Sequence, residues 1–274
     1  MMPSSPAQQE PDALPAPASS DGRRWRLVVL STHFDDAVLS LGGRLAENRI
    51  PKAVVTVHGG APAPGTPVSG WDADCGFRTA EEAHRVRKEE DRLACALVGA
   101  DQVTLPNPDN PYRTAGPLQG LHDLLGSLDP HADVAVPLST SQPDHRAVRD
   151  AALDALAGRA LLVYADLPYA PALTSDWLSA ETVELEKELE HHDPAFRELA
   201  ERYDLTPVRS DPMSARTWSR KRQAILSYAS QLSLVGAMGE VQHMGPLLRF
   251  PGALQRELIW RAVPKGTAPA ADAS

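Results

Sequence analysis

Short apolar runs alternate with segments of helical periodicity along the first two thirds of the chain. The run at 24–31 is continuous and rich in β-branched residues, which is the pattern of a strand buried on both faces. A segment with helical spacing follows it, and a second apolar run comes at 52–60. Strand, helix and strand in this order predict a βαβ unit with parallel strands and a right-handed crossover.

The alternation continues, which predicts an α/β fold with a Rossmann-like, doubly wound and mostly parallel sheet. From Ser175 the pattern becomes helical near 181–203 and 215–230, and a late strand is expected at 257–263. We expect this part to form a helical C-terminal cap. The remaining predicted elements are strands at 102–106, 133–138 and 160–167 and helices at 37–49, 81–98, 117–128 and 146–158.

The two ends of the chain differ in composition from the segment between them. Residues 1–23 are rich in Pro, Ala, Ser and Gln, and residues 265–274 are similar, so we predict a disordered arm and a disordered tail. One folded domain is expected at 24–264. Within it, the Gly- and Pro-rich segment 59–78 is long for a loop, and loops of this length are often functional.

Bulk composition excludes several classes of protein. Hydrophobic residues make up 42% of the chain, which suffices for a core, and the net charge of −9 with a pI near 5.5 argues against a nucleic-acid binder. The charge gives no support for docking on an anionic membrane, and the sequence has neither a secretory h-region nor a bilayer-spanning run. We expect a cytoplasmic protein that acts on a small molecule, with a homo-oligomer left open.

Two polar clusters follow predicted strands. His33, Asp35 and Asp36 follow the first strand, and Asp144 and His145 follow the strand at 133–138. Ligands bind beyond the carboxyl ends of strands in open α/β sheets, so both clusters are expected at one edge. A catalytic zinc site needs three protein ligands and an open position, and a carboxylate outside the ligand set can accept a proton from water.

A simpler interpretation of each cluster is structural. Asp36 could cap the helix that follows it, with His33 stacked on the loop, and Asp144 is a good N-cap for the helix predicted at 146–158. The presence of both clusters at one sheet edge favours a metal site over this interpretation.

Three motifs together resemble those of the PIG-L/LmbE family of zinc-dependent N-deacetylases. The family's A-H-P-D-D turn corresponds to residues 32–36 (THFDD), and its H-x-D-H motif to residues 142–145 (QPDH). Its R-x-x-E-x-x-x-A-x-x-x-L-G helix has counterparts at 87–99, and the segments 164–170 and 221–231 are similar to one bacterial branch. The resemblance covers about residues 25–262.

The resemblance implies a role for each matching residue. His33, Asp36 and His145 would bind zinc, with ferrous or another divalent ion as alternatives. Asp35 would be the general base that acts on a metal-activated water, and Asp144 would orient a histidine or that base. Family substrates are N-acylated amino sugars, glycosides and related small metabolites, cleaved to a free amine and a carboxylic acid.

Gln142 departs from the family pattern, which has histidine there. The family's histidine is expected to polarise the carbonyl or stabilise the oxyanion, whereas a glutamine amide donates a hydrogen bond without a positive charge. Loss of a cationic donor would cost about 10²–10³ in rate. Gln142 could serve as a neutral donor, or the protein could have altered chemistry in specialised metabolism, or it could only bind metal. Phe34 replaces the proline of the turn.

Substrate contacts are predicted from the loops. Trp71 could stack on a sugar face, Asp72 lies beside it, and Arg78 could meet an anionic group. Asp166 is a further candidate at the end of a strand. As an alternative, Trp71 and Phe77 could pin the loop to the core.

Other features of the sequence give weaker indications of function. Arg87 and Glu90 lie one turn apart on a predicted helix and are expected to pair. Cys75 lacks a neighbour that would activate its thiol. Tyr169 is a weaker site candidate. A nucleotide-binding oxidoreductase is disfavoured because no G-x-G-x-x-G follows the first strand, and the glycines at 42–43 lie inside a helical pattern.

Overall fold

The computed structural model describes residues 25–113, 116–167, 169, 182–208, 213–235 and 255–266. The predicted arm at 1–23 lies outside these residues, as does the predicted tail at 265–274 from residue 267 on. Lys265, the first residue of that tail, is ordered, because it donates to the carbonyls of Arg202 and Ala200. The limits of the predicted domain at 24–264 therefore stay a prediction. Among the described helices, none combines the length and the apolar character needed to cross a bilayer.

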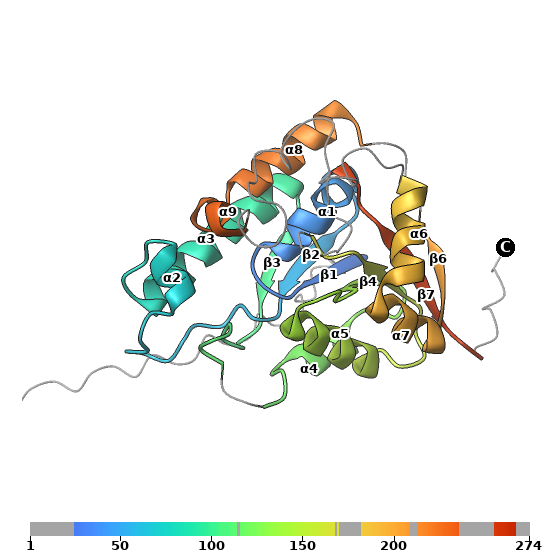
Figure 1. The fold of residues 1–274 in the computed structure, drawn as a ribbon, viewed down its shortest axis with the longest axis horizontal. Coiled ribbons are helices and arrows are strands. Elements are labelled where there is room, and N and C mark those ends of the chain that lie inside the picture. The colour runs from blue at the N-terminus through green and yellow to red at the C-terminus, as the bar shows by residue number, and fades with distance from the viewer. Residues whose placement is uncertain are drawn as a thin grey trace, which may run out of the picture.

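The described strands form one seven-stranded sheet in the order β3-β2-β1-β4-β5-β7-β6 (Figure 1). The strands β3, β2, β1, β4 and β5 are parallel, whereas β7 is antiparallel to both of its neighbours. This confirms the predicted mostly parallel α/β fold. The strands are β1 Leu27–Ser31, β2 Lys52–Thr56, β3 Asp101–Thr104, β4 Asp133–Pro137, β5 Leu161–Tyr164, β6 Tyr203–Pro207 and β7 Ile259–Pro264.

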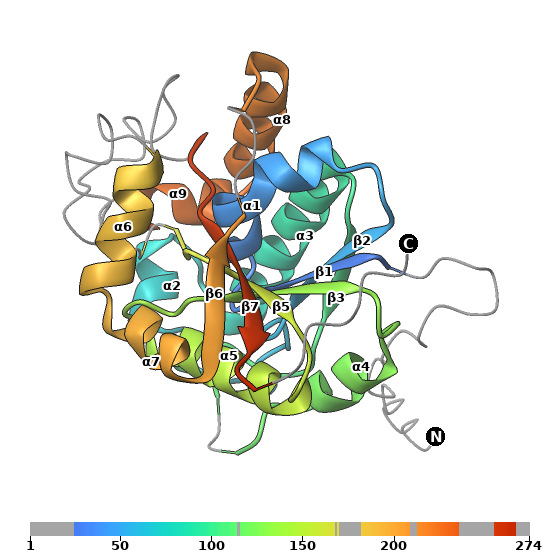
Figure 2. The same ribbon diagram turned by 90° about the vertical axis from the view of Figure 1, so that its right-hand side faces the viewer.

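Helices cover both faces of the sheet. The helices α1, α3 and α8 lie together on one face, and α4 and α5 lie on the other (Figures 1 and 2). β1 and β2 are buried along their whole length, as their continuous apolar sequences require. The helices are α1 Asp36–Glu47, α2 Gly70–Asp74, α3 Ala80–Val98, α4 Leu121–Ser127, α5 Pro143–Ala155, α6 Thr182–His192, α7 Pro194–Arg202, α8 Ala215–Leu226 and α9 Ala229–Val235.

The C-terminal part differs from the predicted helical cap. The helical stretch expected near 181–203 is divided into two helices, because Pro194 cannot donate to the hydrogen-bond ladder of α6 and instead begins α7. The Asp193 carboxylate caps α7 by accepting from the Phe196 N–H at 2.9 Å. Residues 203–207 then form the unexpected edge strand β6, which pairs with the predicted late strand β7. The cap therefore also extends the sheet.

The helix α1 packs closely against α8 at Gly42. A Cβ added to Gly42 would lie 2.9 Å from the Lys221 side chain, so the close approach requires glycine there. Lys221 is fully buried and pairs with Glu257 at 2.7 Å. The same carboxylate accepts from the backbone N–H groups of Gly43 and Arg44. Gly42 thus serves helix packing, and Glu257 fixes the backbone of α1 at Gly43 and Arg44.

The helix α3 is joined to the C-terminal helices by two carboxylates. Asp91, fully buried, accepts from the Tyr228 hydroxyl at 2.8 Å and from Gln102 at 2.7 Å. Glu90 accepts from the backbone N–H and the hydroxyl of Ser230 at the start of α9. The predicted pairing of Glu90 with Arg87 is therefore wrong, since Ser230 occupies the carboxylate.

Asp91 should make stability depend on pH. Burial raises the pKa of Asp91 from its ordinary 3.8 to about 6, against hydrogen bonds from Gln102 and Tyr228 that lower it. The folded state thus binds the proton more tightly than the unfolded state. Protonated Asp91 therefore stabilises the fold. This contribution to the free energy of unfolding, about 3 kcal/mol, is fully present below pH 4 and is lost as the pH rises through 6.

The Asp91→Asn variant should lose this dependence. Urea unfolding of the two proteins between pH 4 and 7 would show a shallower fall of the unfolding free energy for the variant. Asp123→Asn, at a 90% exposed side chain, is the control and should keep the wild-type slope. Parallel curves for Asp91→Asn and wild type would contradict the assignment.

Candidate metal and active site

The two predicted clusters meet where the strand order reverses. β1 pairs with β2 on one side and with β4 on the other. The chain turns to opposite sides after β1 and after β4, and such a switch point leaves a crevice at the carboxyl ends of the strands. His33 and Asp35 follow β1, and Asp36 begins α1. Asp144 and His145 lie in the first turn of α5.

The structure brings His33, Asp36 and His145 together. Asp36 Oδ2 lies 3.4 Å from His33 Nδ1 and 3.3 Å from His145 Nε2. One ligand atom from each residue lies within 4.8 Å of the other two. Asp36 Oδ1 and His145 Nε2 are buried and lack a hydrogen-bond partner within the described chain. Such atoms are rare and costly, and a divalent ion would satisfy them, so these residues fit a metal.

Asp166 orients the ring of His145. Its Oδ2 lies 2.8 Å from His145 Nδ1, and its Oδ1 accepts from the Ser139 N–H at 2.9 Å. A metal-bound imidazole is neutral and carries one N–H and one lone pair, so with an ion bound this contact would leave the lone pair of Nε2 on the side of Asp36. Asp166 is fully buried with both oxygens engaged. This fully buried placement against His145 does not favour the predicted substrate contact, which stays a prediction.

Charge is concentrated at the ligand cluster. Burial would raise the pKa of Asp36, but the charge of His145 and the contacts of His33 hold it at about 2. Burial would lower the pKa of His145, yet Asp36 and Asp166 outweigh it and raise that pKa. Asp36 is therefore a permanent anion at neutral pH. An ion bound here would replace protons on the imidazoles, so metal binding should release protons.

Asp35 is a buried carboxylate without a capping role. It holds the N-cap position of α1, but its side chain makes no capping hydrogen bond, and it is 6% exposed. Burial and the neighbouring charge of Asp36 raise the pKa of Asp35 to about 7, against the charges of His33 and Arg87. A carboxyl group with a pKa near neutrality can both accept and return a proton.

The turn before α5 differs from the expected one. Gln142 takes the N-cap position and Pro143 the first helical position, so the predicted capping by Asp144 is wrong. The half-buried Gln142 side chain makes no hydrogen bond to the described residues. Asp144 instead lies 3.0 Å from Arg113 Nη2 and 3.8 Å from His33 Nε2.

Sequence reasoning missed the loop at 105–113, which we call the β3 loop. Asp109 Oδ1 lies 3.2 Å from His33 Nε2, and Pro108 O lies 3.2 Å from His58 Nδ1. The His58 ring stacks on that of His33, with centroids 5.7 Å apart. Their positions in the sequence could have identified them as site candidates. His58 follows β2 and Asp109 lies beyond β3, so both lie at the same sheet edge as the clusters.

Two of the substrate residues predicted in the loop before α3, Trp71 and Asp72, make packing contacts. Asp72 is buried, pairs with Arg87 and accepts from the Tyr112 hydroxyl at 2.5 Å. This holds the unpredicted helix α2 against α3 and the β3 loop. Trp71 is half-buried and packs against the core, which favours the pinning role. Arg78 is exposed, and its placement leaves its predicted role open.

The sequence profile of the PIG-L family, described as GlcNAc-PI de-N-acetylase, matches residues 28–156. This range contains both clusters, the β3 loop and the strands that carry them. Residues 28–156 belong to the PIG-L family. The resemblance found in the sequence is thereby confirmed. No curated protein sequence matches the chain.

Three solved deacetylases share the fold. The zinc-inhibited form of teicoplanin deacetylase Orf2 has a TM-score of 0.65 at 23% identity, covering 89% of this chain and 100% of that one. A40926 pseudoaglycone deacetylase Dbv21 has a TM-score of 0.59 at 26% identity, covering 89% and 99%. N,N'-diacetylchitobiose deacetylase from Pyrococcus horikoshii has a TM-score of 0.50 at 13% identity, covering 87% and 83%. The similarity extends beyond the PIG-L segment to the C-terminal strands and helices.

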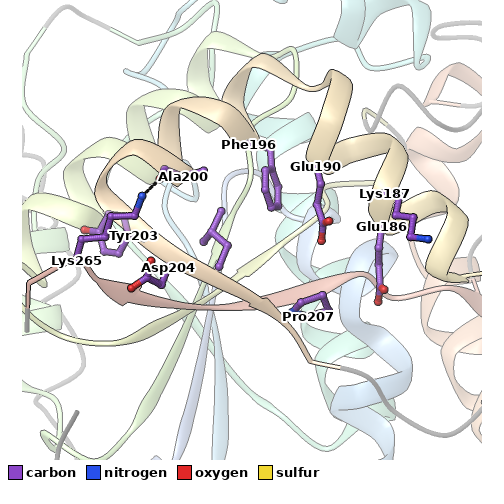
Figure 3. Close-up of a pocket in the computed structure, with 10 residues that line it drawn as sticks. Glu186, Lys187, Glu190, Phe196, Ala200, Tyr203, Asp204, Pro207 and Lys265 are labelled. Carbon is purple, nitrogen blue, oxygen red and sulfur yellow. Dashed lines mark hydrogen bonds between the residues drawn. The ribbon is translucent and has the colours of Figure 1, made fainter. Parts of the chain in front are cut away.

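A hollow of about 410 Å³ lies outside the PIG-L segment, between α6, α7 and β6 (Figure 3). Glu186 and Glu190 enter it from α6, and Asp204 from β6. Glu190 accepts from the Trp260 indole N–H at 3.1 Å, and Lys265 donates to the Ala200 carbonyl at 2.6 Å. None of the histidines of the ligand cluster lines it, so we assign it no part in the chemistry of the site.

Metal analysis tests the ligand cluster directly. The purified protein should bind one divalent ion, and His145→Ala should bind none, because the variant lacks a ligand and leaves Asp36 as an unneutralised buried charge. Inductively coupled plasma mass spectrometry after dialysis would measure both. His122→Ala, at an 82% exposed side chain, should keep the wild-type content. Full metal content in His145→Ala would remove that residue from the ligand set.

Proposed function

We propose that the protein is a metal-dependent hydrolase that removes an acyl group from the nitrogen of a small metabolite, with an N-acylated amino sugar or glycoside as the substrate class. The observation that carries the proposal is the placement of Asp35. This carboxylate is buried and free of a capping bond, beside three ligand groups that include two unpartnered atoms. A metal and a free base side by side are what amide hydrolysis by water requires.

The PIG-L segment and the structural neighbours support this class of reaction. The neighbours described above are deacetylases, and their fold covers most of this chain.

The residues divide the reaction among them. A divalent ion held by His33, Asp36 and His145 would act as a Lewis acid on the acyl carbonyl and lower the pKa of water. Asp35 takes the proton from the attacking water and returns it to the leaving nitrogen. The Gln142 amide donates a hydrogen bond to the acyl oxygen as negative charge develops there. The products are a free amine and a carboxylic acid.

Zinc is the ion that we propose. Two imidazoles and one carboxylate with an open position form a common catalytic zinc set. Ferrous iron is bound by the same types of ligand in other enzymes, so the metal content of the protein decides between them.

Asp35→Asn tests the base. The variant should keep its metal and lose about 10²–10⁴ in kcat, because an amide cannot accept the proton. The measurement is amine release from a panel of N-acetylated and N-acylated amino sugars, with metal content determined on the same samples. Asp74→Asn, at an exposed position on α2, is the control. Undiminished turnover in a metal-loaded Asp35→Asn protein would refute the assignment.

Gln142 supports a second candidate function, that of a PIG-L protein with altered or lost chemistry. If Gln142 is a neutral donor to the acyl oxygen, Gln142→Ala should lower kcat by about 10–10³ while KM changes little. If wild-type protein releases no amine from any member of the panel although it is metal-loaded, the second candidate is favoured. Steady-state kinetics with the best substrate of the panel separate the two.

A further inference from the structure

Each imidazole of the ligand cluster has a carboxylate at the nitrogen that faces away from Asp36. For His145 the carboxylate is Asp166, which lies 2.8 Å from Nδ1. For His33 it is Asp109, which lies 3.2 Å from Nε2. Asp166 follows β5 and is fully buried, whereas Asp109 lies on the β3 loop with a side chain that is 35% exposed.

The role of Asp109 follows from the neutral form that the His33 imidazole must take when it binds a metal. One ring nitrogen carries a hydrogen and the other a lone pair. His33 Nδ1 lies 3.4 Å from Asp36 Oδ2, on the side of the ligand cluster, so with an ion bound the lone pair would lie there. The hydrogen then lies on Nε2, the nitrogen that has Asp109 Oδ1 at 3.2 Å. We propose that Asp109 is a positioning residue that fixes the tautomer and orientation of His33 for metal binding. The inference rests on the proposed metal-dependent function.

Asp144, the other carboxylate near Nε2, is less suited to this role. Its Oδ2 is 3.8 Å from Nε2, beyond hydrogen-bond distance. Its Oδ1 is held by Arg113 at 3.0 Å, which draws the carboxylate toward the guanidinium. Asp109 carries no such ion pair to a cation among the described residues, so its Oδ1 is available to the His33 ring.

The β3 loop is anchored well enough to hold a carboxylate in place. The Asn107 side chain donates to the carbonyls of Val57 and Gln119 and accepts from the Gln119 N–H. The Pro108 carbonyl contacts His58, and the Tyr112 hydroxyl donates to Asp72. Asp109 lies between these contacts, so its position is set by the loop even though its side chain reaches solvent.

The rival interpretation is that Asp109 contacts only the substrate. The two roles differ in their effect on metal affinity when no substrate is present. A carboxylate that orients a metal-bound histidine contributes to metal affinity, and its loss typically costs 10–100-fold. A carboxylate that contacts only the substrate leaves metal affinity unchanged and raises KM when it is removed.

The experiment measures zinc affinity of the full-length protein by competition with a chromophoric chelator, in the absence of substrate. Asp109→Ala should bind zinc about 10–100-fold more weakly than wild type. Asp109→Asn keeps an oxygen that accepts from Nε2–H and should lose less. Asp166→Ala is the comparison on the other imidazole and should lose affinity, and Asp123→Ala at an exposed site should lose none.

The outcomes separate this inference from the proposed function. Asp109→Ala with wild-type zinc affinity, beside a weakened Asp166→Ala, would overturn the inference and leave the metal site standing. An increase in KM with unchanged zinc affinity would assign Asp109 to the substrate. Wild-type protein that binds no ion would contradict the proposed function and the inference together. Near-ultraviolet circular dichroism of Asp109→Ala and Asp109→Asn shows whether each variant keeps the fold.

Discussion

The arrangement of the site follows from one buried negative charge. Asp36 is 1% exposed and ionised, with an unpartnered Oδ1, at the start of a helix whose first turn lies in the switch-point crevice. An ionised carboxylate out of water is costly unless positive charge and donors surround it. His33 and His145 supply part of that environment, and the two atoms without partners point to a cation as the rest. The outer contacts of Asp166 and Asp109 then follow from the need to aim the imidazoles.

The fold places these groups by keeping two helix starts and one loop at the edge of the sheet. α1 brings Asp36 from β1, and α5 brings His145 from β4, because the two strands are neighbours and parallel. α1 is held by Lys221 of α8, which packs against Gly42, and by Glu257, which accepts from the N–H groups of Gly43 and Arg44. The C-terminal third thus contributes stability to the site while lying outside the PIG-L segment. Its antiparallel strands β7 and β6 extend the sheet beyond β5.

Much of the sheet and of the ligand cluster could be predicted from the sequence, because the patterns that indicate them lie within short segments of the chain. Continuous apolar runs predict buried parallel strands, and polar residues directly after two of them predict the edge where His33, Asp36 and His145 meet. The contacts that the sequence did not predict depend on tertiary neighbours. Arg87 bonds to Asp72 on another helix rather than to Glu90 one turn away, and Asp166 turns inward to His145 because the start of α5 lies beside the end of β5. Asp109 belongs to a Pro- and Asn-rich loop without hydrophobic periodicity, so its contact with His33 could not be predicted from the sequence pattern.

The central claim is that two imidazoles and one carboxylate hold a single cation at the switch point. The most direct test is an anomalous difference map from crystals of the metal-loaded protein. The account predicts one peak bonded to His33 Nδ1, His145 Nε2 and Asp36, at about 2.0–2.2 Å for each protein ligand. A peak bonded to Asp109 and Asp144 without His145, or no peak in this crevice, would contradict it.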